Sequence, residues 1–237
     1  MTDWAARHAK TSRKQRSASA GLLFALSALV VLIVLAAAFV ALVLWPRGAP
    51  VAPDAPTLPV TVGGVLFNVP PGAIRVAMQR RPGAQERLDL AFLWPSLETP
   101  DPKARPAPSE AAPPIDRLFL TIEPQVAALT PSDRVRLIYP RYLAETQFDG
   151  PDGLKVIAFK EGTPYQGEDL IYDATGPGFV VRCSRGAGGP TPGICLYEQR
   201  IETADVVVRF PRDWLDDWRS VAGTIDRLVA RLRPSRG

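Results

Sequence analysis

Histidine is nearly absent from this sequence. The one histidine, His8, lies within the first 19 residues, so the rest of the chain has none. This absence excludes His-based triads, Cys–His nucleophiles and ordinary zinc sites from most of the protein. The chain also lacks a G-x-S-x-G elbow, and the glycine-rich stretch at 186–189 lacks the Gly-Lys-Ser/Thr of a phosphate loop. We expect no catalytic residue, cofactor or metal site.

Net charge is absent from most of the chain as well. The formal charge is +4, but five of the 28 Lys and Arg residues and only one of the 24 Asp and Glu residues precede residue 46. The remaining residues therefore carry equal numbers of both signs. A domain without net charge has no positive electrostatic field that would attract the phosphates of a nucleic acid, and no basic motif with interleaved aromatics occurs in it. Nucleic acid is excluded as an expected partner.

A long apolar run is what the sequence does have. Residues 20–45 contain no charge and no proline. A helix of this length would extend about 39 Å at ~1.5 Å per residue, against about 30 Å of hydrocarbon. Residues 20–45 are predicted to be a transmembrane helix in contact with membrane lipid, and the basic residues of 1–19 predict that this tail stays in the cytoplasm.

A cleavable signal peptide is the alternative to this uncleaved signal anchor. Its apolar core would be about 7–15 residues long and would end at a small-residue cleavage site. Here the run is longer, and seven apolar residues follow the small residues 36–38. We expect a single-pass protein of the bacterial inner membrane with a periplasmic C-terminal domain.

The two cysteines, Cys183 and Cys195, both fall in this exported part. The periplasm is oxidising, so a disulfide bond is expected. The two residues lie at symmetrical positions of a predicted hairpin around Gly189. A redox or metal role is the alternative, but the spacing is not C-x-x-C.

Amino-acid composition divides the rest of the chain into a linker and one domain. Residues 46–58 are a Pro/Ala linker, and residues 59–237 are one domain with a Pro-rich, disordered loop at 97–114. Alternating apolar residues predict strands at 86–95 and 115–123. Further strands are predicted, at 58–62 and 65–70 around Gly63-Gly64, and at 73–81, 154–160, 169–174, 179–184, 194–201 and 205–210.

Two helices are expected in the domain. Thr130, Pro131 and Asp133 predict a helix start, and Pro140 should kink or end that helix. The clearer helix starts near Asp213 and carries apolar residues at spacings of three and four through Leu232. We expect this helix to pack on the sheet; lying on a membrane surface is the alternative.

Two acidic stretches were considered as sites. The sequence at 149–153 faintly resembles a calcium loop but lacks the alternate oxygen ligands, so a turn is expected. Glu168, Asp169 and Asp173 would serve acid–base chemistry only within a cleft, and solvated strand ends are the expectation.

The predicted fold class is α+β: an antiparallel sheet of about six to eight strands packed by the C-terminal helix. The favoured function is a non-catalytic envelope module that binds a protein. The alternatives are a carboxylate-dependent cell-wall enzyme and a periplasmic binder of a small ligand.

Overall fold

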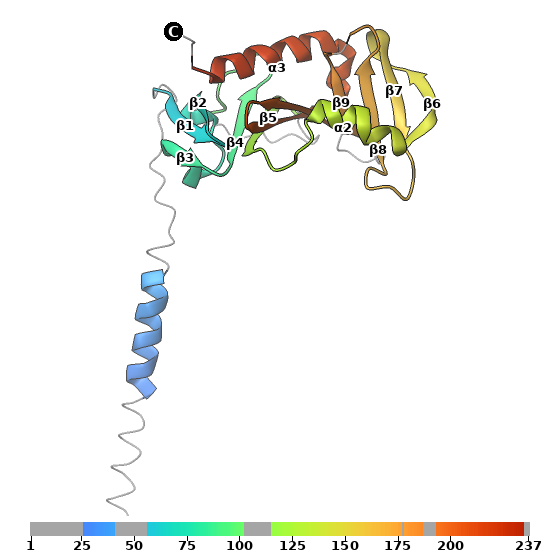
Figure 1. Cartoon of the computed structure of the whole chain (residues 1–237). Helices are drawn as coiled ribbons and strands as arrows, with labels where there is room; N and C mark the ends of the chain where they lie inside the picture. The colour runs from blue at the N-terminus through green and yellow to red at the C-terminus, as the bar shows by residue number, and fades with distance from the viewer. Residues whose placement is uncertain (1–25, 41–55, 102–114, 177, 187–192, 235–237) are drawn as a thin grey trace, which may run out of the picture. The chain divides into compact units, whose positions relative to one another are not determined.

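The structure is a computed structural model of the whole chain, and it describes residues 26–40, 56–101, 115–176, 178–186 and 193–234. The chain divides into two compact units, Met1–Arg47 and Gly48–Gly237. In the first unit, residues 26–40 form a helix whose apolar side chains are all exposed (Figure 1). The second unit holds every strand.

The predicted span is covered only in part by this helix. In the described part of the chain, no helix has both the length and the hydropathy needed to cross a membrane. The rest of the predicted span 20–45, the tail 1–19 and most of the linker 46–58 lie outside the described residues. The transmembrane anchor therefore stays a prediction.

A large antiparallel sheet forms the body of the second unit, as predicted. Eight strands are ordered β4-β5-β11-β10-β9-β8-β7-β6, and each neighbouring pair is antiparallel. The strands are β4 (Leu88–Leu93), β5 (Arg117–Pro124), β6 (Leu143–Asp149), β7 (Leu154–Phe159), β8 (Glu168–Asp173), β9 (Val180–Ser184), β10 (Ile194–Ile201) and β11 (Ala204–Pro211).

A second, three-stranded sheet begins the unit. The predicted hairpin is present as β1 (Leu58–Val62) and β2 (Val65–Val69), and β3 (Gly83–Gln85) pairs parallel to β1. Gly63 and Gly64 both have positive φ, which the two-residue turn requires. A Cβ on Gly63 would lie 2.5 Å from the Thr203 carbonyl oxygen, so this turn fits closely against the β10–β11 turn.

Helix α3 (Trp218–Leu232) lies along one face of the large sheet (Figure 1), and the main core contains residues of α3 and of both sheets. Its predicted apolar face is confirmed: Val221, Ile225 and Leu228 are fully buried. They pack with the inward side chains of β4, β5 and β11, among them Phe92 and Phe210. The helix packs on its own sheet, as expected.

The opposite face of the large sheet carries a much smaller helix, α2 (Pro131–Leu137). Successive residues Leu170 and Ile171 of β8 belong to two different hydrophobic clusters, one on each face of the sheet. Leu170 packs with Tyr139 and Phe159, which lie under and beside α2. On this face α2 reaches the sheet at β10, where Arg134 pairs with Glu198.

Several predicted boundaries were wrong. Residues 73–81 do not form a strand: η1 (Pro71–Ala73) and η2 (Ala77–Gln79) are 3-10 turns joined through an isolated bridge at Ile74. The side chain of Gln79 bonds both the backbone N–H and the carboxylate of Asp89 on β4, so it holds this segment in turns. The C-terminal helix starts at Trp218 rather than near Asp213, after the 3-10 helix η5 (Arg212–Asp217).

Two further expectations need correction. The loop at 97–114 is not disordered from its first residue, because Leu97 is 5% exposed and packs in the main core; residues 102–114 lie outside the described residues. Strand β6 was not predicted. The helix before it ends at Leu137, and Pro140 falls in the 3-10 turn η3 (Tyr139–Arg141).

Candidate functional site

Helix α2 is fixed at its N-terminus by a capping box. The Thr130 hydroxyl accepts a bond from the Asp133 N–H at 3.1 Å, and the Asp133 carboxylate accepts from the Thr130 N–H. The bond from the Thr130 hydroxyl lowers the pKa of the Asp133 carboxyl. This prediction of a helix start is confirmed.

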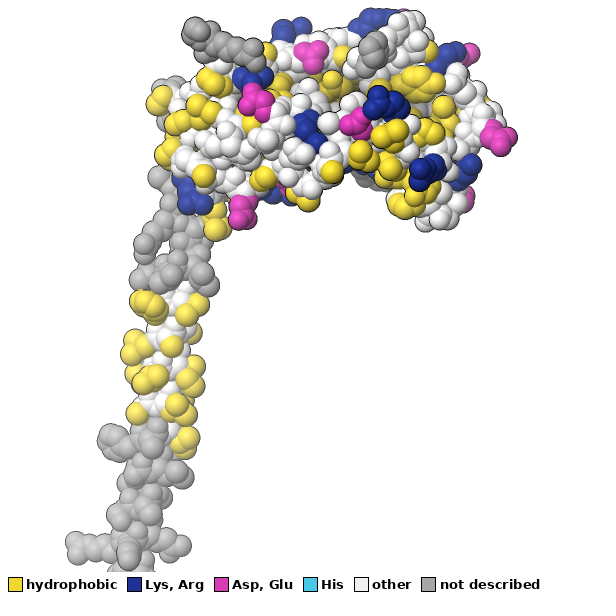
Figure 2. All heavy atoms as spheres, viewed as in Figure 1, with side chains coloured by type: hydrophobic (Ala, Val, Ile, Leu, Met, Phe, Trp, Pro, Cys, Tyr) yellow, Lys and Arg dark blue, Asp and Glu magenta, His cyan; other side chains and the backbone are white. Residues whose placement is uncertain are grey.

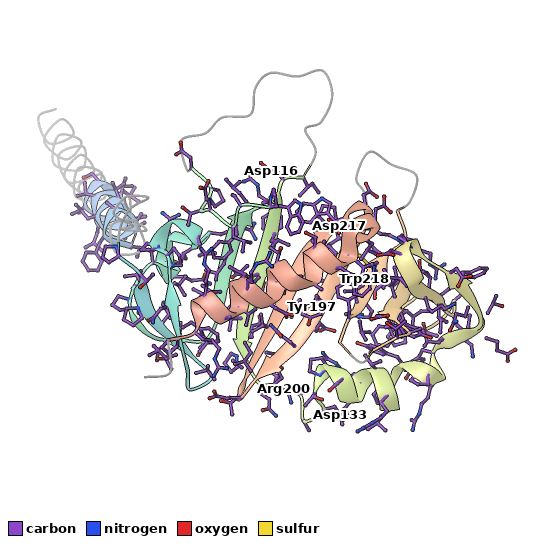
Figure 3. All side chains as sticks on the ribbon, turned by 90° about the horizontal axis from the view of Figure 1, so that it is seen from above. Asp116, Asp133, Tyr197, Arg200, Asp217 and Trp218 are labelled. Carbon is purple, nitrogen blue, oxygen red and sulfur yellow. A yellow bond between two sulfur atoms is a disulfide. The ribbon has the colours of Figure 1, made fainter. Side chains whose placement is uncertain are left out.

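Arg200 positions the segment that leads into α2. Its guanidinium pairs with Asp205 at 2.7 Å and donates to the carbonyl oxygens of residues 127, 128 and 129. The side chain is only 10% exposed, and the bond to Asp205 raises the pKa of Arg200. Figure 3 shows Arg200 beside Asp133 at the start of α2. One cation therefore anchors α2 to the sheet.

Aromatic rings fill the space under α2. Tyr139 meets Phe159 and Tyr165 edge-on, with ring centroids 5.4 and 5.1 Å apart, and Tyr165 also meets Tyr142. The Arg182 guanidinium lies over the Tyr165 ring at 5.0 Å. Rings from the η3 segment, from strand β7 and from the β7–β8 connection thus form one cluster.

The charged groups near this cluster are paired within the domain. Arg182 bonds Glu168 at 2.9 Å, and Arg134 of α2 bonds Glu198 of β10 at 3.0 Å. All four side chains are less than 30% exposed. Because each cation is neutralised by its own carboxylate, the surface above them presents rings and aliphatic groups rather than net charge.

A groove of about 420 Å³ opens beside this cluster, between α2 and the outer face of β8, β9 and β10. The groove lies where β10 extends beyond the shorter strand β9. The pairing of the two strands ends at Tyr197, and β10 continues to Ile201. Figure 2 shows hydrophobic side chains gathered over α2 and β8. The apolar and aromatic walls are the side chains of Val135, Tyr139, Leu170, Tyr172, Val180 and Leu196.

Four of the five tyrosines, Tyr139, Tyr142, Tyr165 and Tyr172, lie in this groove or in the cluster under it, whereas Tyr197 packs in the main core on the α3 face. Burial raises the pKa of Tyr139, so its phenol stays neutral at physiological pH. Tyr172 donates its hydroxyl to Gln147 of β6 at 2.7 Å. The walls therefore combine neutral hydroxyl groups with broad ring faces.

The predicted disulfide is present. Cys183 and Cys195 are directly opposite in the β9–β10 pair, and their sulfurs are bonded. Both residues are fully buried on the α3 side of the sheet. The bond therefore lies on the face opposite the groove and holds β9 against β10.

The three carboxylates considered for acid–base chemistry do not converge. Glu168 and Asp169 point to opposite faces of β8, and the Asp173 carboxylate accepts the N–H and hydroxyl of Thr175 in a turn. Asp169 is not a solvated strand end, because it is 5% exposed and bonds Arg212 at 2.7 Å and Arg185 at 3.0 Å. Each of the three carboxylates therefore bonds other groups of its own domain and has a structural role.

The acidic stretch at 149–153 forms a turn, as expected. Its 3-10 turn η4 (Pro151–Gly153) contains Asp152 at a positive φ, and Asp149 pairs with Lys155. Within the described ranges, no group of three or more His, Cys, Asp or Glu residues could hold a metal ion.

Sequence reasoning missed the groove. Four of the five tyrosines, confined to residues 139–172, were a visible signal of an aromatic surface. Their meeting point was not visible, because it depends on strand order and on where β9 begins.

Comparison with known proteins gives a fold but no family. No protein-family model and no curated protein match the chain. Among solved structures, it is similar to an immunity protein of the Stenotrophomonas maltophilia type IV secretion system, with a TM-score of 0.53 and 16% identity over 76% of this chain and 94% of that one. This likeness shows a shared fold.

A second solved structure is the iron-regulated outer membrane lipoprotein FrpD of Neisseria meningitidis. It has a TM-score of 0.39 and 8% identity, over 78% of this chain and 97% of that one. A score this low supports no argument.

Proposed function

We propose that this protein is a non-catalytic module of the bacterial cell envelope and that it binds a partner protein in the groove beside α2. The observation that carries the proposal is the gathering of four of the five tyrosines, Tyr139, Tyr142, Tyr165 and Tyr172, at this one place. Tyrosine is enriched at protein interfaces because it offers a large ring and a polar tip at low entropic cost.

The electrostatics of the groove favour a protein side chain as occupant. The buried ion pairs of Arg134 and Arg182 are already formed, so a partner meets apolar and aromatic surface without stripping water from free charges. A protein anchor residue of ordinary size fits a groove of this volume.

Location and partner class are further parts of the proposal. The predicted apolar span and the disulfide bond support a periplasmic domain held at the inner membrane. The fold shared with an immunity protein supports the narrower idea that the partner is a toxin delivered by a secretion system, which this protein neutralises.

Photo-crosslinking in the native envelope tests the interaction. A photoreactive residue would replace Ser132 or Arg136, which are exposed at the groove, or Ser220, which is exposed on α3, as the control. We expect the same discrete protein adduct from both groove positions and none from 220. No adduct, or the same adduct from all three positions, would contradict the proposal.

Co-culture tests the narrower idea. Cells without this protein should lose viability beside cells with an active secretion system, and the full chain should restore it. Restoration by the Tyr172→Ala variant at equal protein level would argue against neutralisation through the groove.

A small ligand is the second candidate occupant, because the groove volume falls within the range of about 300–1,000 Å³ typical of ligand pockets. Native mass spectrometry of protein extracted from membranes decides this point. A constant added mass that disappears in Tyr172→Ala would favour the ligand over the protein partner.

A further inference from the structure

The segment at residues 75–81 is unusually exposed for its composition. Met78 is 74% exposed and Val76 is 41% exposed, although both are apolar. Residues 73–81 were predicted to be a strand with a buried face, yet only the first two, Ala73 and Ile74, are buried. The segment around η2 therefore directs apolar side chains into solvent.

Three arginines flank these apolar side chains. Arg75, Arg80 and Arg81 form no ion pair among the described residues, and Glu86 is the one acidic residue in the sequence between 70 and 86. Arg75 is held with its guanidinium over the Phe119 ring at 4.6 Å, and Arg80 donates to the Ile74 carbonyl at 3.0 Å. These contacts orient the guanidinium groups of Arg75 and Arg80, and no described carboxylate neutralises them.

The segment lies beside the place where the domain begins. In the β1–β3 pair, Gly83 is opposite Val60, so residues 81 and 82 are level with Leu58 and Pro59 at the start of β1. Residues 46–57 separate Leu58 from the predicted span, and fully extended they reach at most about 40 Å. Given that span, the start of β1 lies no farther than about 40 Å from the bilayer surface, so the segment can reach it.

We infer that residues 75–81 form a contact with anionic phospholipid at the outer leaflet of the inner membrane. Unpaired guanidinium groups attract phosphate-bearing headgroups, while Met78 and Val76 enter the interfacial layer. Tethering makes a weak contact effective, because the span holds the segment at high local lipid concentration. The inference rests on the predicted anchor and not on the groove.

Lipid contact can be measured on the full chain in nanodiscs. Ala77 is exposed and both native cysteines are in a disulfide, so Ala77→Cys provides one thiol for an environment-sensitive fluorophore. The matched control is Thr146→Cys, an exposed position on β6 at the other edge of the large sheet. Discs would contain phosphatidylcholine alone or with 30% phosphatidylglycerol, together with a spin-labelled quencher lipid.

In discs with phosphatidylglycerol, we expect at least threefold more quenching at position 77 than at position 146. Quenching should fall to the control level in phosphatidylcholine discs and in the Arg80→Gln/Arg81→Gln variant. Equal quenching in both lipids, or no quenching at 77 in protein that co-purifies with the discs, would overturn the inference. Failure to co-purify with discs would instead contradict the anchor itself.

Discussion

The two faces of the large sheet are built differently. On one face, α3 buries seven of its residues in a continuous core shared by both sheets. On the other, α2 has seven residues, none of them buried, and its cluster contains only Tyr139, Phe159 and Leu170 as fully covered side chains. The contrast indicates that the α3 face supplies stability and that the α2 face is free to serve binding.

The largest expected effect comes from the α3 face. Leu228→Ala removes a fully buried side chain from the main core and should cost about 4 kcal/mol, whereas Leu170→Ala in the small cluster should cost about 2 kcal/mol. Urea unfolding of the full chain measures both. Equal losses of unfolding free energy in the two variants would show that the two faces of the sheet contribute equally to stability.

Removing the disulfide bond should have the next largest effect on stability. The bond closes a loop with a sequence separation of 12, and removing it through Cys183→Ser/Cys195→Ser should cost about 3 kcal/mol. Reduction of the unaltered protein is the companion measurement. A midpoint of thermal unfolding unchanged by either treatment would contradict a stabilising role for this bond.

The capping box offers a local test of the α2 face. Thr130→Ala should cost about 1 kcal/mol, because it removes the acceptor for the Asp133 N–H. Hydrogen exchange should speed up in residues 131–137 while α3 keeps its protection, and Thr130→Ser should restore the slow exchange. Faster exchange in α3 as well would show that the two faces unfold as one unit.

The smallest effect is expected at alkaline pH. Burial raises the pKa of Tyr139 above its unfolded value of about 10, so stability is complete below pH 10 and falls as pH rises toward the folded pKa. Tyr139→Phe should resemble the unaltered protein at pH 8 and lose less stability between pH 10 and 11. Parallel curves for the two proteins would refute a buried, neutral phenol.

The α3 face was largely predictable and the α2 face was not. Alternation along β4 and the spacing of Val221, Ile225 and Leu228 predict burial, because one face of each element is apolar. Strand β6 gives no such pattern, since most of its side chains are exposed. The sequence shows neither which face of the sheet α2 covers nor where β9 begins, and both define the groove.

The disulfide illustrates what local spacing can predict. Cys183 and Cys195 are equally distant from the hairpin centre, so an antiparallel register places them opposite each other. The roles of Asp169 and Arg200 depend on residues far along the chain, Arg212 and the carbonyls of 127–129. Such partners cannot be paired from sequence spacing alone.

The most direct test compares one variant from each face of the sheet in the same assay. The measured quantity is the yield of the crosslinked adduct from photoreactive position 132 in native envelopes, divided by the amount of folded protein. The account predicts that Tyr172→Ala removes the adduct at unchanged protein level, whereas Leu228→Ala lowers the protein level but not the yield per folded molecule. A normal yield from Tyr172→Ala, or an equal loss per folded molecule in both variants, would contradict the assignment of binding to the α2 face.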